Sequence, residues 1–235
     1  MRDELIATFT AYNQTIWPAQ IALVVLALAL VFAAVRGGEG SGRVVYAGFA
    51  LLWAWCGIVF FLAFYARHAL VPTVPYVFGV AFVIQAVLFG RAAVIGRDSV
   101  TALRANGPGL VGAAMVIYAL LVYPLLASAL GQHYPGQPTF GAPCPLTIFT
   151  FGLLLMAVGR VPGHLLAIPF LWSLAGFFPV LRAGILEDIG LIAAGLIALP
   201  MLLVHNRRVA SAMSSPPTPG VGETPAPMQG TGRLQ

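Results

Sequence analysis

Long apolar runs constrain this chain more than any other feature of its sequence. Seven of them follow one another, separated by turns and loops, at 17–35, 44–66, 72–90, 110–130, 146–161, 165–181 and 189–204. Only 8% of the residues are charged, whereas a soluble domain carries about 25%. Such a chain cannot face water on all sides, so the sequence predicts an all-α, polytopic membrane helix bundle with seven transmembrane helices.

Composition divides the chain into three predicted parts. Residues 1–16 are too polar to cross a bilayer, but apolar residues recur there at helical spacing, which predicts a short helix lying in the membrane interface. Residues 17–208 are the predicted membrane domain, in which the basic link 91–109 has room for a further surface helix. Residues 209–235 are rich in Pro, Gly, Ser and Thr and are predicted to be a disordered cytoplasmic tail.

The arginines predict how the bundle sits in the membrane. All 12 basic residues are Arg, and the apolar runs place only Arg2, Arg67 and Arg182 on the side of the N-terminus. Because basic residues favour the cytoplasmic side of short loops, we expect the N-terminus outside, the C-terminus inside and the loop 132–145 facing outward. The net charge of +5 therefore reflects topology and does not indicate nucleic-acid binding.

Residues 132–152 hold most of the chemistry available to the chain. They carry His133 and, at the start of the fifth predicted span, Cys144 between Pro143 and Pro145, with no charged residue. A thiol at a helix N-terminus meets unpaired N–H groups and the positive end of the helix dipole, which favour a thiolate and a soft metal. Alternatively, the prolines set the angle of entry into the span and Cys144 fills a small apolar gap. The sequence leaves both readings open.

The predicted topology collects five candidate ligand or metal-binding residues on the outer face: His68, His133, Cys144, Glu187 and Asp188. Together, such nitrogen, sulfur and oxygen donors could hold a metal ion or pass protons. They come from three separate loops, however, and their spacing matches no zinc signature. Glu187 and Asp188 also suit the start of the last span, where acidic residues favour a helix N-terminus. A joint site and unrelated loop positions remain alternatives.

Polar side chains within the predicted spans are few and mild. Gln85, Thr147 and Thr150 are candidate intramembrane polar contacts, because a polar group in hydrocarbon must find a partner. No ionisable Asp, Glu, Arg or His lies at mid-span, so the parts of a proton relay, a voltage sensor or a haem-binding bundle are missing. Nucleotide-binding and hydrolase motifs are absent as well. We therefore assign no catalytic residue, do not expect an enzyme and leave any cofactor unknown.

Several short stretches carry a family resemblance: Tyr12-Asn13, Trp17-Pro18-Ala19-Gln20, 52–57, 123–126, 141–152, 168–174 and 187–190. Together they resemble a bacterial family of multi-pass membrane proteins, domain of unknown function 6064, over roughly residues 9–205. The Pro-Cys-Pro segment is its most specific part. The family pattern includes a Tyr-His pair in the second span, where this chain has Phe60-Phe61, so a metal role for that His does not carry over. The resemblance implies an integral membrane protein and supplies no reaction, ligand or partner. We expect the protein to lie in the inner membrane.

Two functions remain open at this point. The first is binding or transport of a small solute or a metal ion at the outward face near Cys144. The alternative is a structural or accessory subunit that packs against a membrane-protein partner and has no ligand of its own, which suits the missing mid-span charge. A redox enzyme using Cys144 is a weaker third reading, because no resolving cysteine is evident. In each case the lipid bilayer is an expected partner.

Overall fold

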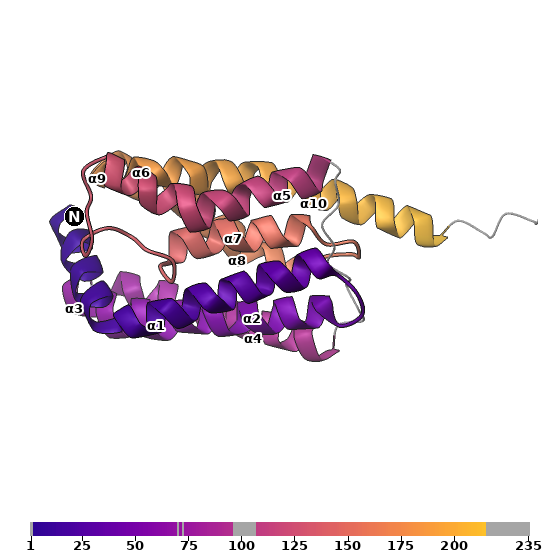
Figure 1. The fold of residues 1–235 in the computed structure, drawn as a ribbon, viewed down its shortest axis with the longest axis horizontal. Coiled ribbons are helices and arrows are strands. Elements are labelled where there is room, and N and C mark those ends of the chain that lie inside the picture. Colours follow the sequence, from indigo (N-terminus) through magenta and orange to yellow (C-terminus); the bar gives the residue numbers. More distant parts are fainter. Residues whose placement is uncertain (1, 70, 72, 96–106, 215–235) are drawn as a thin grey trace, which may run out of the picture.

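The structure is a computed structural model that describes residues 2–69, 71, 73–95 and 107–214, and these residues form helices joined by loops (Figure 1). The elements in chain order are α1 (Arg2–Arg36), α2 (Ser41–Trp55), η1 (Cys56–Tyr65), α3 (Ala66–His68), α4 (Thr73–Ile95), α5 (Gly107–Ile117), η2 (Tyr118–Val122), α6 (Tyr123–Ala129), α7 (Pro143–Leu155), α8 (His164–Ala175), α9 (Phe177–Ala183), η3 (Leu186–Asp188) and α10 (Ile189–Ser214).

Six helical stretches in the described part of the chain are long and apolar enough to cross a membrane. They are Arg2–Arg36, Ser41–His68, Thr73–Ile95, Gly107–Ala129, His164–Ala183 and Leu186–Met213. The fifth predicted span corresponds to α7, which has 13 residues. At a rise of 1.5 Å per residue it is about 20 Å long, shorter than a hydrocarbon core of about 30 Å.

The short helix α7 forms the centre of the bundle. Figure 1 shows it between α5, α6 and α10 on one side and α1, α2 and α4 on the other. Every residue of α7 is buried, as expected for a helix that is apolar all round. It packs closely against α5, because a Cβ added at Gly152 would lie 2.8 Å from the backbone oxygen of Gly112. Small residues of this kind let membrane helices approach closely.

Two helices in the described part of the chain contain wide π-helical turns. The stretch η2 directly precedes Tyr123-Pro124. Since Pro has no N–H, it cannot donate to the carbonyl four residues earlier, and a widened turn is one way for a helix to accommodate it. The longer stretch η1 begins at Cys56, and its second residue, Gly57, packs closely against Gly79 of α4.

The N-terminal helix is longer than the sequence predicts. α1 runs without a break from Arg2 through Trp17-Pro18, so the helix starts well before Trp17. Its first half is ordered by packing, because Phe9 and Tyr12 contact the ring of Phe60 in η1. At the other end of the chain, α10 extends to Ser214. Most of the predicted tail and the predicted surface helix of the 91–109 link lie outside the described residues.

The connections place three regions at one end of the bundle, which we call the N-terminal end. The start of α1, the loop 130–142 and the turn between α9 and η3 all lie there (Figure 1). Hydrogen bonds join two of them: the side-chain amide of Asn13 donates to the carbonyls of Pro135 at 2.6 Å and Gln137 at 2.8 Å. The start of α1, the loop 130–142 and the turn before α10 therefore share one end of the molecule.

Candidate functional site

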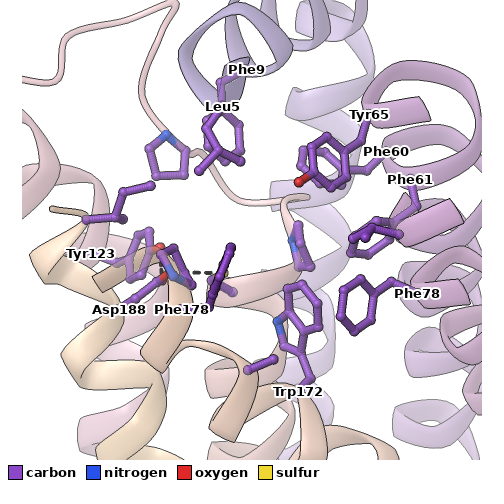
Figure 2. A pocket seen from close by; sticks show the side chains of 17 residues that line it. Leu5, Phe9, Phe60, Phe61, Tyr65, Phe78, Tyr123, Trp172, Phe178 and Asp188 are labelled. Atoms are coloured by element: carbon purple, nitrogen blue, oxygen red, sulfur yellow. Dashed lines mark hydrogen bonds between the residues drawn. The ribbon is translucent and has the colours of Figure 1, made fainter. Parts of the chain in front are cut away.

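A cavity of about 320 Å³ opens at the N-terminal end. Figure 2 shows its walls, which come from α1, η1, α4, α6, α7, α8, α9 and the turn before α10. Eight of the 17 residues that line it are aromatic: Phe9, Phe60, Phe61, Tyr65, Phe78, Tyr123, Trp172 and Phe178. The cavity is therefore an apolar space enclosed by helices that are far apart in the sequence.

The aromatic wall is held by contacts among its own rings. Trp172 of α8 packs edge-to-face against Phe61 and Phe78, with centroid distances of 5.4 and 5.0 Å. Phe60 packs edge-to-face against Phe61 at 5.2 Å. Such pairs stabilise by about 0.5–1.5 kcal/mol beyond the burial of their area. Rings fixed in this way keep the cavity open instead of filling it.

One wall of the cavity carries three polar side chains that bond to one another, which we call the Asp188 triad: Tyr123, Cys144 and Asp188. The Tyr123 hydroxyl donates to Asp188 Oδ1 at 2.5 Å, and the Cys144 thiol donates to Asp188 Oδ2 at 3.6 Å. In Figure 2, Tyr123 and Asp188 lie across the cavity from Phe60, Phe61 and Tyr65. Three elements thus contribute one residue each: α6, α7 and η3.

The carboxyl group of Asp188 has an unusual electrostatic setting. Asp188 is 1% exposed, and both groups that bond to it are neutral. No positively charged side chain among the described residues acts on it. A buried carboxylate without a cation is costly, because the loss of hydration is only partly replaced by neutral donors.

The neighbouring carboxyl group, Glu187, points elsewhere and does not line the cavity. Its Oε2 accepts a bond of 3.4 Å from the side chain of Gln132, and its Oε1 is buried without a partner among the described residues. Arg2 lies close enough to act on its charge. The Tyr118 hydroxyl donates to the Glu187 backbone carbonyl at 2.8 Å, which fixes the turn. Adjacent acids therefore have different surroundings.

The loop 130–142 is held against α1 and η1 by polar contacts. Gln20 donates to Asn13 Oδ1 at 2.6 Å and to Thr139 Oγ1 at 2.8 Å, extending the Asn13 bonds described above. Further along the loop, the carbonyl of Gly141 accepts bonds from the Tyr12 hydroxyl at 2.8 Å and the Cys56 thiol at 3.0 Å. These contacts fix the segment that leads into α7 and so fix the position of Cys144.

The structure brings together two of the five predicted ligand residues, Cys144 and Asp188. Glu187 is adjacent but bonds to the loop, His133 is exposed on that loop, and His68 is half-buried at the end of α3. In residues 2–69, 71, 73–95 and 107–214, no three His, Cys, Asp or Glu side chains are grouped so that they could hold a metal ion.

The predicted intramembrane polar residues all have partners within the bundle. Thr147 and Thr150 donate to backbone carbonyls of their own helix, and Thr150 also accepts a bond of 3.0 Å from the Trp53 indole. Gln85 donates to the carbonyl of Leu165 at 3.0 Å. That carbonyl lacks its usual helical donor, because the residue four positions later is Pro169. Gln85 of α4 thus replaces an N–H that α8 does not have.

Two features of the site were not evident from the sequence. Tyr123 is a mid-span tyrosine with no local pattern that links it to Asp188. Asn13 and Gln20 fall in a helix whose partner loop follows more than a hundred positions later. For Tyr123 and Gln20 the available signal was the cost of a polar group in an apolar segment, which requires a partner but does not identify it. Asn13 lies in the polar segment 1–16, where no such signal exists.

Comparison with known proteins adds one match. The model of a family described as "Family of unknown function (DUF6064)" matches residues 2–213. No curated protein and no solved structure matches the chain. The site described above is therefore the main basis for a functional assignment.

Proposed function

Because the chain belongs to the DUF6064 family, whose function is unknown, we propose its activity from the cavity: it is an integral membrane protein that binds a small, largely apolar molecule. The observation that carries this proposal is the aromatic cavity of about 320 Å³ with one polar wall. Ligand pockets run from about 300 to 1,000 Å³ and combine apolar walls with a few polar groups. The Asp188 triad supplies those polar groups.

We propose that the protein binds its ligand and does not carry it across the membrane. The cavity lies at the N-terminal end, while α7 fills the centre of the bundle with side chains that are all buried. A transport route would have to pass this helix. Binding of a small solute at the outward face is therefore favoured over transport. It is also favoured over a metal site, because no three His, Cys, Asp or Glu side chains are grouped among the described residues.

We place the cavity at the outer face of the inner membrane, with the N-terminus outside and α7 as a seventh, shorter traverse. The support is the excess of arginines in the segments at the opposite end of the bundle. A cysteine introduced at Gly136, in the loop 130–142, tests this placement in a chain whose two native cysteines are replaced by serine. We expect a membrane-impermeant maleimide to label it in intact spheroplasts; labelling only after lysis would reverse the orientation.

Binding can be tested with a neutral apolar probe, neopentylbenzene, and a variant that fills the cavity. Ala175 lines the cavity, so Ala175→Phe places a ring inside it. Ala29→Phe adds the same ring at an exposed position of α1 and serves as the control. A ligand that binds only the folded state raises the unfolding temperature, so the readout is the midpoint of thermal unfolding in detergent micelles at rising probe concentration.

We expect the probe to raise the unfolding midpoints of the wild-type protein and of Ala29→Phe equally. For Ala175→Phe, the probe concentration that gives the same shift should be at least about tenfold higher, which corresponds to about 1.4 kcal/mol in binding free energy. Equal stabilisation of all three proteins would show partition into the micelle and would contradict the proposal. No stabilisation of any of them, together with co-purification of a second membrane protein, would favour an accessory subunit instead.

A further inference from the structure

We infer that the ligand of this cavity is a small organic ammonium ion, with its charge beside Asp188 and its apolar body among the aromatic rings. The inference rests on the proposed function, since it names the chemical class that the same cavity would bind. Three observations support it. Asp188 is buried without a cation among the described residues, aromatic rings line the opposite wall, and the indole N–H of Trp172 has no hydrogen-bond partner there.

The carboxyl group of Asp188 is matched to a positive charge that the described residues do not supply. Its two hydrogen bonds come from the Tyr123 hydroxyl and the Cys144 thiol. Both donors direct their protons at Asp188, so neither is left to bond a ligand. The wall therefore offers lone pairs and negative charge, which suit a cation far better than a carbonyl or an anion. A ligand cation would also offset the cost of burying the carboxylate.

The opposite wall is suited to the same charge. Phe60, Phe61 and Tyr65 lie across the cavity from Asp188 (Figure 2). Aromatic faces attract a cation within about 6 Å, and the attraction strengthens when water is excluded. Recognition of ammonium ions by clustered rings uses this effect. A carboxylate on one side and rings on the other would hold a positive centre from both directions.

Trp172 leaves a polar atom available at the same cavity. Its ring lines the wall, and its indole nitrogen is buried without a hydrogen-bond partner among the described residues. A buried N–H that lacks a partner is destabilising, because it has lost its hydrogen bond to water. An acceptor atom elsewhere on the ligand would remove that cost. An apolar space needed only for packing would require neither this N–H nor the carboxylate.

Two probes of equal shape isolate the role of charge. Benzyltrimethylammonium carries a positive nitrogen where neopentylbenzene carries a neutral carbon. Binding of each is measured as the shift of the unfolding midpoint in nanodiscs of phosphatidylcholine, whose headgroups have no net charge. The variants are Asp188→Asn, which removes the charge at the cavity, and Glu187→Gln, which removes the adjacent charge that does not line it.

We expect Asp188→Asn to weaken binding of benzyltrimethylammonium about tenfold or more, as the loss of a close charge pair should. Binding of neopentylbenzene should change less than about twofold in either variant. Glu187→Gln should weaken binding of benzyltrimethylammonium far less than Asp188→Asn does, because the Glu187 carboxyl group does not line the cavity. If Asp188→Asn does not fold, displacement of neopentylbenzene from the wild-type protein by benzyltrimethylammonium decides the matter. Displacement supports the inference, and its absence overturns it.

The outcomes also separate this inference from the proposed function. If neopentylbenzene binds in the cavity and benzyltrimethylammonium does not, the cavity is a neutral apolar site and only the ammonium inference fails. An ammonium affinity that is the same in Asp188→Asn and wild-type protein leads to the same conclusion. If neither probe binds, both the inference and the proposed function fail.

Discussion

Tyr123 and Asp188 are 65 positions apart in the chain, and the hydroxyl of one donates a hydrogen bond to the carboxyl group of the other. The bond joins α6 to the turn before α10, at the end of the bundle where the cavity opens. It also holds the Asp188 oxygen on the wall of that cavity.

Replacing Tyr123 by Phe should destabilise the fold. The ring stays but the hydroxyl is lost, so a buried carboxyl oxygen loses a donor, which costs about 1–3 kcal/mol in the free energy of unfolding. Denaturant unfolding in mixed micelles measures it. Tyr76→Phe is the matched control, because Tyr76 is 54% exposed on α4. Equal unfolding free energies for the two variants would show that the Tyr123–Asp188 bond contributes nothing.

Replacing Asn13 by Ala should loosen the loop 130–142. The amide of Asn13 donates to two loop carbonyls, and its loss leaves both without that donor. We expect amide hydrogen exchange in the loop to rise by at least about tenfold, the equivalent of about 1.4 kcal/mol. The exposed neighbour Gln14 provides the control, Gln14→Ala, for which exchange should match wild type. Unchanged protection in Asn13→Ala would mean that other contacts hold the loop.

Replacing Gln85 by Leu should destabilise the protein, and a second substitution should repair it. Gln85→Leu leaves the Leu165 carbonyl without a donor, at a cost of about 1–3 kcal/mol. In the double variant with Pro169→Ala, α8 regains its own N–H at the right position. A double-mutant cycle on the free energy of unfolding should therefore give a coupling of about 1 kcal/mol or more. Additive effects would contradict the explanation of this bond.

Replacing Gly152 by Ala should separate α7 from α5. An added Cβ would lie 2.8 Å from the Gly112 carbonyl oxygen, which is backbone and cannot rotate away. Overpacking of this kind costs about 1–3 kcal/mol. Gly163→Ala is the control, because nothing lies within 4 Å of its added Cβ. If thermal unfolding shows the same midpoint for both variants, the two helices are not held by this contact.

The sequence predicted where the helices lie in the chain better than it predicted whether each helix faces lipid or the protein interior. Apolar length located the long helices. It could not tell that α7 is enclosed, because Leu, Ile and Phe suit lipid and a protein interior equally well. The continuity of α1 was missed for a related reason: its polar N-terminal half is ordered by contacts with η1 and the loop 130–142, which no local pattern reveals.

The candidate site was only partly predictable. Arginine counting put Cys144 and Asp188 at the same end, and they meet there. Whether donors at one end converge depends on side-chain directions set by packing, however, and His133 and His68 remain apart from the pair. For Tyr123, the sequence indicated only that a hydroxyl group in an apolar span should form a hydrogen bond. A sequence without comparison to relatives does not specify which residue across the bundle supplies that partner.

The enclosure of α7 has a consequence for how the protein is made. The helix leaves the ribosome after α1 to α6 but before α8 and α10, which cover much of its surface. Until those later helices are synthesised, α7 has only part of its final surroundings. Its insertion is therefore coupled to the completion of the C-terminal third of the chain, and truncations that end between α7 and α10 should be targets for membrane quality-control proteases.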